Sequence, residues 1–502
     1  MYNTLYIWKK VIKRSQMSTL SKQEKINWYQ WESSALAKAK QENRAIFLFI
    51  DSPTSQWSQK MQKDSFEDAN IIELLNERFI AIRVNKYERP DIERYYQKIY
   101  SLMNREPTAS PLSLFLTENL EPFYAGSYIP SEAIDQQLSL DSLLRIISKK
   151  YITDYDTLVQ KGEEVLSFID KQEKTVQATK LDINITKTIE LHTKNLLDSK
   201  FGGFTKAPKF PNTSTLELLL TSYELTKNES TLSAITLTLD NMTKGGFYDK
   251  ARGGFYQYAT DEAWEEAYEL KTSYDNAQLI KLYLRAFTIT KNETYKKVAF
   301  KTIDFMLNQR GESKLFSLKG ENIIGSWNAL MVQALFLASQ IDETYKHHAL
   351  ETLEALLSTL YVSGTLYHSK KPNEKPSIKA FLDDYATLGE ALIMAYQNIK
   401  EESFLIMATQ FSNLIIEQYY EQAQWVYTTG QFKLKESIYD KEIPSALASA
   451  LSLLFTINSL VDNDYRTFIF KTLELHSYTL MRQPFSSPTL TKVMLSYLKE
   501  EE

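Results

Sequence analysis

Two serines, Ser55 and Ser58, have the spacing at which a pair of cysteines would carry out thiol–disulfide exchange. They lie in the stretch Ser55-Gln56-Trp57-Ser58, after an apolar run at 45–50 and before a short polar helix. The chain contains no cysteine, and a hydroxyl neither ionises as a thiol does nor forms a disulfide. Thiol–disulfide oxidoreductase activity is therefore excluded for this chain. Because no histidine lies near Ser55 in the sequence to activate it, we expect this serine to cap the helix.

Aspartates in the second half of the chain are the other candidates for chemistry. Glycoside hydrolysis needs two carboxyl groups, and sugar epimerisation needs an acid and a base. Such a pair could come from four aspartates in Gly-rich or aromatic motifs, Asp249, Asp275, Asp383 and Asp384. Neighbouring side chains are predicted to line a ligand pocket: Tyr248, Tyr274, Asn276, Trp327, Asn328 and Tyr385. Taken singly, Asp275, Ser326 and Asp383 are also suited to cap helices.

Composition limits the class of protein. A chain of 502 residues with 43% hydrophobic and 24% charged residues is typical of a soluble globular protein with at least two domains. The net charge of -5 gives no electrostatic reason to expect nucleic acid as a partner. None of the five histidines lies in a motif, so we expect no metal site, and no cofactor is indicated.

Membrane association is also not indicated. No apolar run approaches the roughly 18 residues of a membrane span, so we expect no integral membrane association and a cytoplasmic location. Residues 5–14 are basic and amphipathic but lack the apolar core and cleavage site of a signal peptide. We interpret 1–26 as an N-terminal extension, with a surface anchor or a translation start at Met17 as alternatives.

The first predicted domain, 27–150, alternates strands and helices. Helical periodicity predicts a helix opened by Trp28 and Trp31, and further helices follow through Met61, at 70–78, at 91–102 and after Pro130. Apolar runs predict strands at 44–50, 79–84, 111–116 and 121–125. The order β-α-β, then β-β-α, matches a thioredoxin fold.

The remainder is predicted to be helical. A polar connector at 151–180 leads to a domain at 181–502, in which we count about twelve amphipathic segments: 183–198, 214–226, 231–244, 275–290, 293–309, 326–341, 344–361, 383–399, 401–420, 444–459, 464–479 and 488–500. Consecutive pairs of such helices predict an (α/α)6 toroid, with an open helical solenoid as the alternative. No fixed repeat of 34 to 47 residues is visible, which favours the closed ring.

Motifs along nearly the whole chain resemble one family, the thioredoxin-like proteins related to spermatogenesis-associated protein 20. The matching stretches include Ser65-Phe66-Glu67-Asp68, Tyr274-Asp275-Asn276-Ala277-Gln278, Ser326-Trp327-Asn328-Ala329-Leu330 and Phe381-Leu382-Asp383-Asp384-Tyr385-Ala386. The resemblance implies a thioredoxin-like domain joined to a six-hairpin toroid related to glycoside hydrolases and N-acylglucosamine 2-epimerases. It also implies that Pro111 occupies the cis-proline position facing the active-site turn.

Several reactive groups of that family are missing here. Its Thr-Cys-His-Trp-Cys-His stretch reads Thr54-Ser55-Gln56-Trp57-Ser58-Gln59, and a His and a Glu expected before Tyr274 are absent from 268–273. Our first hypothesis is therefore a redox-inactive pseudoenzyme with a binding or regulatory role, whose toroid pocket holds a carbohydrate-like or peptide ligand. The alternative is a glycosidase- or epimerase-like enzyme that uses the four aspartates.

Overall fold

The computed structural model describes residues 25–106, 110–134, 137–169, 177–318, 322–421 and 424–501. It divides into two compact units, Met1–Lys174 and Thr175–Glu502. The basic stretch at 5–14, Met17 and all but the last two residues of the predicted extension lie outside the described residues.

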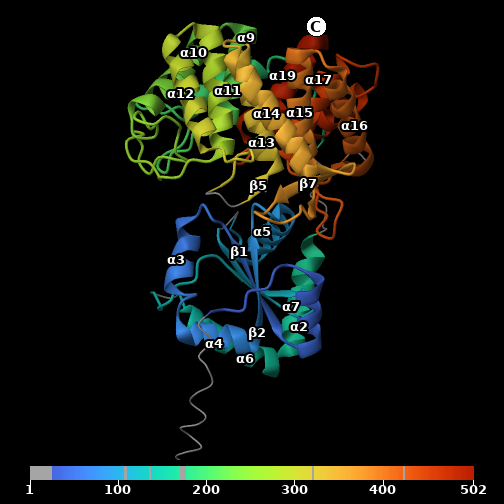
Figure 1. Ribbon diagram of the computed structural model, residues 1–502. Coiled ribbons are helices and arrows are strands. Elements are labelled where there is room, and N and C mark those ends of the chain that lie inside the picture. The colour runs from blue at the N-terminus through green and yellow to red at the C-terminus, as the bar shows by residue number, and fades with distance from the viewer. Residues whose placement is uncertain are drawn as a thin grey trace, which may run out of the picture. The chain divides into compact units, whose positions relative to one another are not determined.

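The first unit is a four-stranded sheet covered by helices (Figure 1). Its elements are α2 (Ser33–Glu42), β1 (Ala45–Asp51), α3 (Gln56–Asp64), α4 (Ala69–Arg78), β2 (Phe79–Asn85), α5 (Pro90–Asn104), β3 (Leu112–Leu116), β4 (Pro122–Gly126), α6 (Leu140–Thr153) and α7 (Tyr155–Ile169). The strand order is β2-β1-β3-β4, in which β1 and β2 are parallel and β3 and β4 are antiparallel to their neighbours. This arrangement confirms the predicted thioredoxin-like fold.

Strand β1 lies in the interior of the sheet, and all seven of its residues are buried. A continuous apolar run suits such a strand because both of its faces are covered. Phe47 and Phe49 point to a core formed with α3, α4 and α6. The tryptophans expected to open the first helix lie before α2, because the chain is extended there: Tyr29 bridges Ile82, and Trp28 packs edge-on against Phe66.

Part of the stretch expected to be a connector is a packed helix. Helix α7 contacts β4 and α5, and Lys98 Nζ donates to the carbonyl of Ile169 at 2.7 Å. Its buried residues Leu158 and Ile169 explain why it associates with the sheet. Only the residues after α7 remain for a linker, and 170–176 lie outside the described residues.

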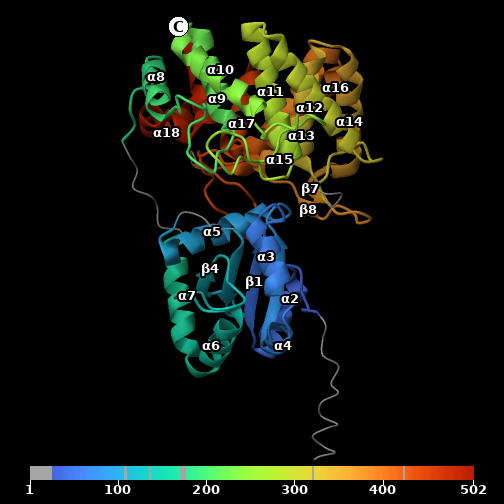
Figure 2. The ribbon, with the colours of Figure 1, turned by 90° about the vertical axis from the view of Figure 1, so that its left-hand side faces the viewer.

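The second unit is a ring of helices (Figure 2). Its described helices are α8 (Ile185–Leu196), α9 (Thr213–Thr226), α10 (Glu229–Lys244), α11 (Ser273–Thr290), α12 (Glu293–Gln309), α13 (Gly325–Ser339), α14 (Thr344–Leu360), α15 (Leu382–Ile399), α16 (Glu402–Tyr419), α17 (Ala446–Asn458), α18 (Arg466–Arg482) and α19 (Pro488–Glu501). All twelve correspond to predicted segments.

Six of these helices close an inner ring. Contacts run from α9 to α11, α13, α15, α17 and α19, and from α19 back to α9, so the structure is closed and the open solenoid is excluded. Helix α13 is buried almost all round, as expected for an inner helix enclosed by neighbours. Between consecutive inner helices the chain returns through one outer helix, so the inner helices all begin at the same end of the ring. Short unpredicted strands, among them β5 (Ile323–Ile324) and β7 (Thr365–Lys370), lie at that end.

Candidate functional site

The first predicted site is the turn at the start of α3. Ser55 is the N-cap of this helix, and its Oγ accepts from the backbone N–H of Trp57 at 3.3 Å. Ser58 is buried, and its Oγ accepts from the N–H of Ser52 at 3.1 Å. The peptide bond before Pro111 is cis, and the carbonyl of Ser110 lies 3.5 Å from Ser55 Oγ. Capping by Ser55 is therefore confirmed, and the cis Ser110–Pro111 bond lies beside the turn.

Restoring both thiols should restore a redox couple. We expect the double variant Ser55→Cys, Ser58→Cys to form an intramolecular disulfide and to release two thiols on reduction. The pKa of a cysteine at position 55 should lie below 8.5, because a helix N-terminus stabilises the thiolate. Thiol titration across glutathione buffers of different potential measures this. The Ser55→Cys single variant is the control, and an equally poor response of both variants would show that the turn is distorted.

The second site lies inside the helical ring. The hydrogen bonds of Gln333 identify which helix faces point into this interior. This α13 side chain accepts from Lys281 Nζ of α11 at 2.7 Å and donates to the carbonyl of Thr387 (2.9 Å) and to Glu390 Oε2 (3.2 Å) of α15. Helices α11 and α15 flank α13 on opposite sides, and its outer face is covered by α14. A side chain that reaches both flanking helices must therefore point into the ring.

Helical geometry extends this inner face toward the start of each helix. A residue seven positions earlier lies on the same face within about 20° and roughly 10 Å away. Seven positions before Lys281, Gln333 and Glu390 lie Tyr274, Ser326 and Asp383. We call these three residues the upper layer, and Lys281, Gln333 and Glu390 the lower layer.

An aromatic pair includes one residue of the upper layer, Tyr274. The rings of Tyr274 and Trp327 lie 4.7 Å apart, so the structure brings together two of the predicted pocket residues from α11 and α13. The Tyr274 hydroxyl also accepts from Gln257 Nε2 at 3.0 Å. Aromatic rings beside hydrogen-bonding groups are typical of sites for sugars and similar ligands.

The lower layer was not predicted from the sequence. Burial lowers the pKa of Lys281, and the residue remains partly exposed. Nearby, Arg285 pairs with Glu217 and with Glu224, the latter at 2.7 Å. The sequence feature that could have indicated this layer is a pair of cations, Lys281 and Arg285, inside an otherwise apolar helix.

Asp275 belongs to the first turn of α11. Thr272 is the N-cap of that helix, and its hydroxyl donates to Asp275 Oδ2 at 2.5 Å. Burial, with a smaller effect from the Glu442 carboxylate, raises the pKa of Asp275 to about 8. Asp275 is therefore protonated at neutral pH. Neither Asp275, Ser326 nor Asp383 is an N-cap, because the helices begin earlier than each of them.

Asp384 is held by three donors. Its Oδ2 accepts from His368 Nδ1 at 2.8 Å and from the N–H of Phe381 at 2.9 Å, and its Oδ1 accepts from the N–H of Ser326 at 3.2 Å. Burial raises its pKa to about 6, although the neighbouring His368 opposes that rise. His368, on β7, was not singled out from the sequence, because nothing local marks a histidine that meets an aspartate through the fold.

Asp383 differs from the other candidate aspartates. The residue is 6% exposed, and its Oδ1 is buried without a hydrogen-bond partner among the described residues. Of the four candidates, the other three all have side-chain bonds. Asp383 is therefore the candidate best placed to accept a hydrogen bond from a ligand.

Asp249 is engaged elsewhere. Lys271 Nζ lies 2.7 Å and Arg252 Nε 3.2 Å from its Oδ2. Burial opposes its ionisation, but the N–H of Arg252 and the Lys271 ammonium prevail and lower the pKa of Asp249 to about 2. The adjacent Tyr248 packs its ring 4.8 Å from Phe255. The structure thus places these two residues in the packing of the loop after α10.

Three further predicted pocket residues have structural roles. Asn276 accepts from the N–H of Phe255 (2.7 Å) and donates to its carbonyl (3.0 Å), and Asn328 does the same with Phe316 (2.8 and 2.9 Å). Both asparagines are fully buried. Tyr385 packs against Phe411 of α16, on the outer side of α15. In the structure these three side chains hold loops and pack helices.

A segment before α17 reaches across the ring. We call residues 436–445 the strap. The Glu442 carbonyl accepts from Gln278 Nε2 of α11 at 2.9 Å, although α11 and α17 stand on opposite sides of the ring. Asp440 fixes the strap by accepting from the N–H groups of Ser445 (2.9 Å) and Thr489 (2.8 Å). Glu442 therefore adds a second carboxylate near Asp275.

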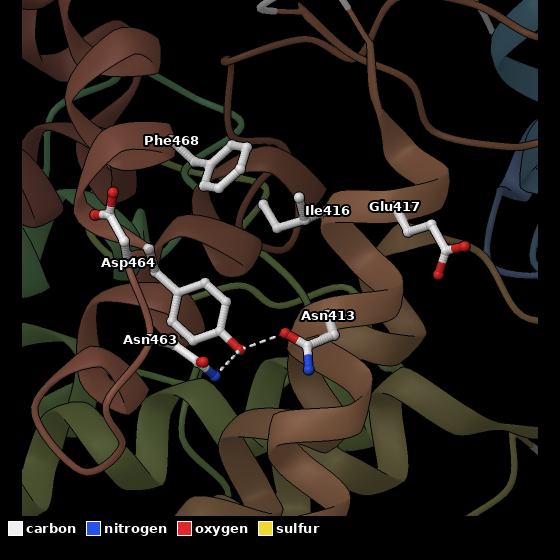
Figure 3. Close-up of a pocket in the computed structure, with 7 residues that line it drawn as sticks. Asn413, Ile416, Glu417, Asn463, Asp464 and Phe468 are labelled. Atoms are coloured by element: carbon white, nitrogen blue, oxygen red, sulfur yellow. Dashed lines mark hydrogen bonds between the residues drawn. The ribbon is translucent and has the colours of Figure 1, made fainter.

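A separate pocket of about 260 Å³ lies on the outer helices (Figure 3). There the Tyr465 hydroxyl donates to Asn413 Oδ1 at 2.7 Å and accepts from Asn463 Nδ2 at 3.1 Å. The other residues that line this pocket are Ile416, Glu417, Asp464 and Phe468. None of the predicted site residues lines it, so it is distinct from the ring interior.

The chain consists of a thioredoxin-like unit without thiols, followed in sequence by an (α/α)6 toroid with a polar interior. These two units together define its structural class. Residues 10–170 match the family described as "Protein of unknown function, DUF255". The chain is 33% identical over 288 residues to spermatogenesis-associated protein 20 of Mus musculus, a match covering 55% of this chain and 36% of that protein. It is 30% identical over 280 residues to the uncharacterized protein B0495.5 of Caenorhabditis elegans, covering 54% and 38%. The chain, which contains no cysteine, is therefore similar to spermatogenesis-associated protein 20 and its relatives, and the matches span little more than a third of the length of these proteins.

Solved structures confirm the toroid. A cellobiose 2-epimerase from Bacillus thermoamylovorans has a TM-score of 0.52 at 10% identity, covering 63% of this chain and 99% of the other. A GH76 alpha-mannanase from Bacteroides thetaiotaomicron has a TM-score of 0.50 at 13% identity, covering 64% and 96%. At such identities the likeness shows the fold alone. In the described part of the chain, no helix is long and apolar enough to cross a membrane.

Proposed function

We propose that this protein is a redox-inactive thioredoxin-like protein whose toroid binds a sugar-like ligand between the two layers of its interior, in a binding or regulatory role without turnover. The observation that carries the proposal is that an aromatic pair, Tyr274 and Trp327, and the unpartnered carboxylate oxygen of Asp383 all lie near the starts of inner helices of the ring. A cytoplasmic location is part of the same proposal.

Two of the other candidate carboxylates already bind protein groups, and this supports ligand binding over catalysis. Hydrolysis by a carboxyl pair requires two groups that can reach the substrate and exchange protons. Asp249 is ion-paired with Lys271, and all three acceptor contacts of Asp384 serve to hold neighbouring backbone and His368. These two aspartates are therefore poor candidates for reaction with a substrate.

A second candidate function, a glycosidase- or epimerase-like enzyme, is favoured by Asp275. A carboxyl group with a pKa of about 8 is protonated at neutral pH and can act as a general acid. In this alternative Asp275 supplies a proton and Asp383 acts as the base or nucleophile. The same fold occurs in the epimerase and the mannanase named above.

Thermal unfolding with a panel of neutral sugars, including glucose, mannose and cellobiose, tests both functions. We expect at least one sugar to raise the unfolding temperature, while chromatography of the incubated sugar detects no product. Product that disappears in the Asp275→Asn variant would establish the enzyme instead. A panel that shifts nothing would contradict both candidates.

A further inference from the structure

We infer that Asp383 is the anchor of the ligand site, and that the ligand is a sugar that presents hydroxyl or ammonium donors and carries no negative charge. This inference rests on the proposed function and adds to it the contact residue and the charge class of the ligand.

The first support is the state of the Asp383 carboxylate. It is more than nine-tenths buried, and its Oδ1 has no hydrogen-bond partner among the described residues. A buried carboxylate oxygen without a donor is costly, because it has lost water and gained nothing in exchange. A ligand that donates a hydrogen bond to this oxygen removes that cost. A surface carboxylate gains less from the same ligand, because water already solvates it.

The second support is the direction in which the Asp383 side chain points. Asp383 and Glu390 lie seven residues apart on α15, so both belong to the face that points into the ring. Glu390 is fixed on that face by its bond to Gln333. Tyr385, two positions after Asp383 and thus on nearly the opposite face, packs outward against Phe411. The carboxylate of Asp383 is therefore directed to the interior.

The third support is the charge of the surroundings. The carboxyl groups at this end of the ring include Asp384 on α15, Asp440 and Glu442 on the strap, and Asp275, which is protonated at neutral pH; His368 is bound to Asp384. Lys281, in the lower layer, is bonded to Gln333 and interacts with Glu390. A second cation, Lys492 on α19, interacts with Lys281, Glu217 and Asp440, and neither lysine is bonded to Asp383 among the described residues. An anionic sugar would meet repulsion there, whereas hydroxyl and ammonium groups would be stabilised.

Three sugars that differ mainly in charge test the inference: glucose, glucosamine and glucuronate. Calorimetric titration of the full chain should give the order glucosamine, then glucose, with glucuronate at least tenfold weaker than glucose. The Asp383→Asn variant keeps the shape of the side chain and removes its charge. We expect it to weaken glucosamine binding by about ten- to a hundredfold, the range of hydrogen bonds to charged groups.

The matched control is Asp462→Asn, which removes the same charge from an exposed position and should bind as the wild type does. Should Asp383→Asn fold poorly, the charge series on the wild type decides alone. Glucuronate binding as tightly as glucosamine, or an Asp383→Asn variant that binds normally, would overturn the inference and leave the proposed function intact. Failure of all three sugars, and of the neutral panel, would overturn both.

Discussion

Replacing Asp275 by asparagine should stabilise the protein at pH 8 to 9 and leave its stability almost unchanged near pH 4. In the folded state the pKa of Asp275 is raised from 3.8 to about 8, so folding favours the protonated carboxyl. The stability that this group contributes is complete below pH 4 and is lost as the pH rises through 8. At about 1.4 kcal/mol per pKa unit, the rise from 3.8 to about 8 corresponds to a loss of about 6 kcal/mol.

Unfolding by heat or denaturant at a series of pH values measures this effect. The difference between Asp275→Asn and the wild type should grow steadily between pH 4 and pH 8. The exposed variant Asp462→Asn, with the same charge removed, should show no such growth. A constant difference across the range would mean that Asp275 is ionised in the folded protein, and the general-acid candidate would lose its basis.

Replacing Asp384 by alanine should destabilise the second unit by on the order of 4 kcal/mol at neutral pH, whereas Asp383→Ala should cost less than about 1 kcal/mol. The loss of Asp384 leaves the buried N–H groups of Ser326 and Phe381 and the His368 ring without their acceptor. Asp383 has no such partners to abandon. Each buried donor left unpaired costs about 1–3 kcal/mol.

Denaturant unfolding of the two variants, followed by helical circular dichroism, provides the comparison. The two substitutions remove the same atoms from adjacent residues, so each serves as the control for the other. Equal losses would indicate that the hydrogen bonds of Asp384 contribute little, and that the start of α15 is held by apolar packing alone.

Much of the architecture follows from periodicity. The run at 44–50 predicts β1 because a strand buried on both faces must be apolar throughout, and the twelve helical segments follow from apolar residues at helical spacing. The prediction that Trp28 and Trp31 open a helix was wrong. Their spacing fits a helix, but the backbone there is extended beside β2. Strands as short as β5 have no periodicity to detect.

The candidate site was predicted less completely than the fold. Tyr274, Trp327 and Asp383 were identified because polar and aromatic residues stand out at the start of apolar helices. The asparagines at 276 and 328 stand out in the same way, yet their amides bind backbone groups of distant loops. The meeting of His368 with Asp384, and of Lys281 with Gln333, depends on which helices become neighbours. Such pairings are set by tertiary structure and leave no local signal.

The two asparagines of α11 and α13 couple the loops of the ring to its inner helices. Asn276 and Asn328 each occupy the fourth position of an inner helix, and each binds both the N–H and the carbonyl of a phenylalanine in the preceding loop. The same bonding therefore fixes the loops before two consecutive inner helices in the same way. At the fourth position of α15 the residue is Tyr385, whose ring packs against Phe411 instead. Each asparagine thus makes the loop at one end of the ring an extension of the helix that follows it, so a change in either loop is transmitted to the start of that helix.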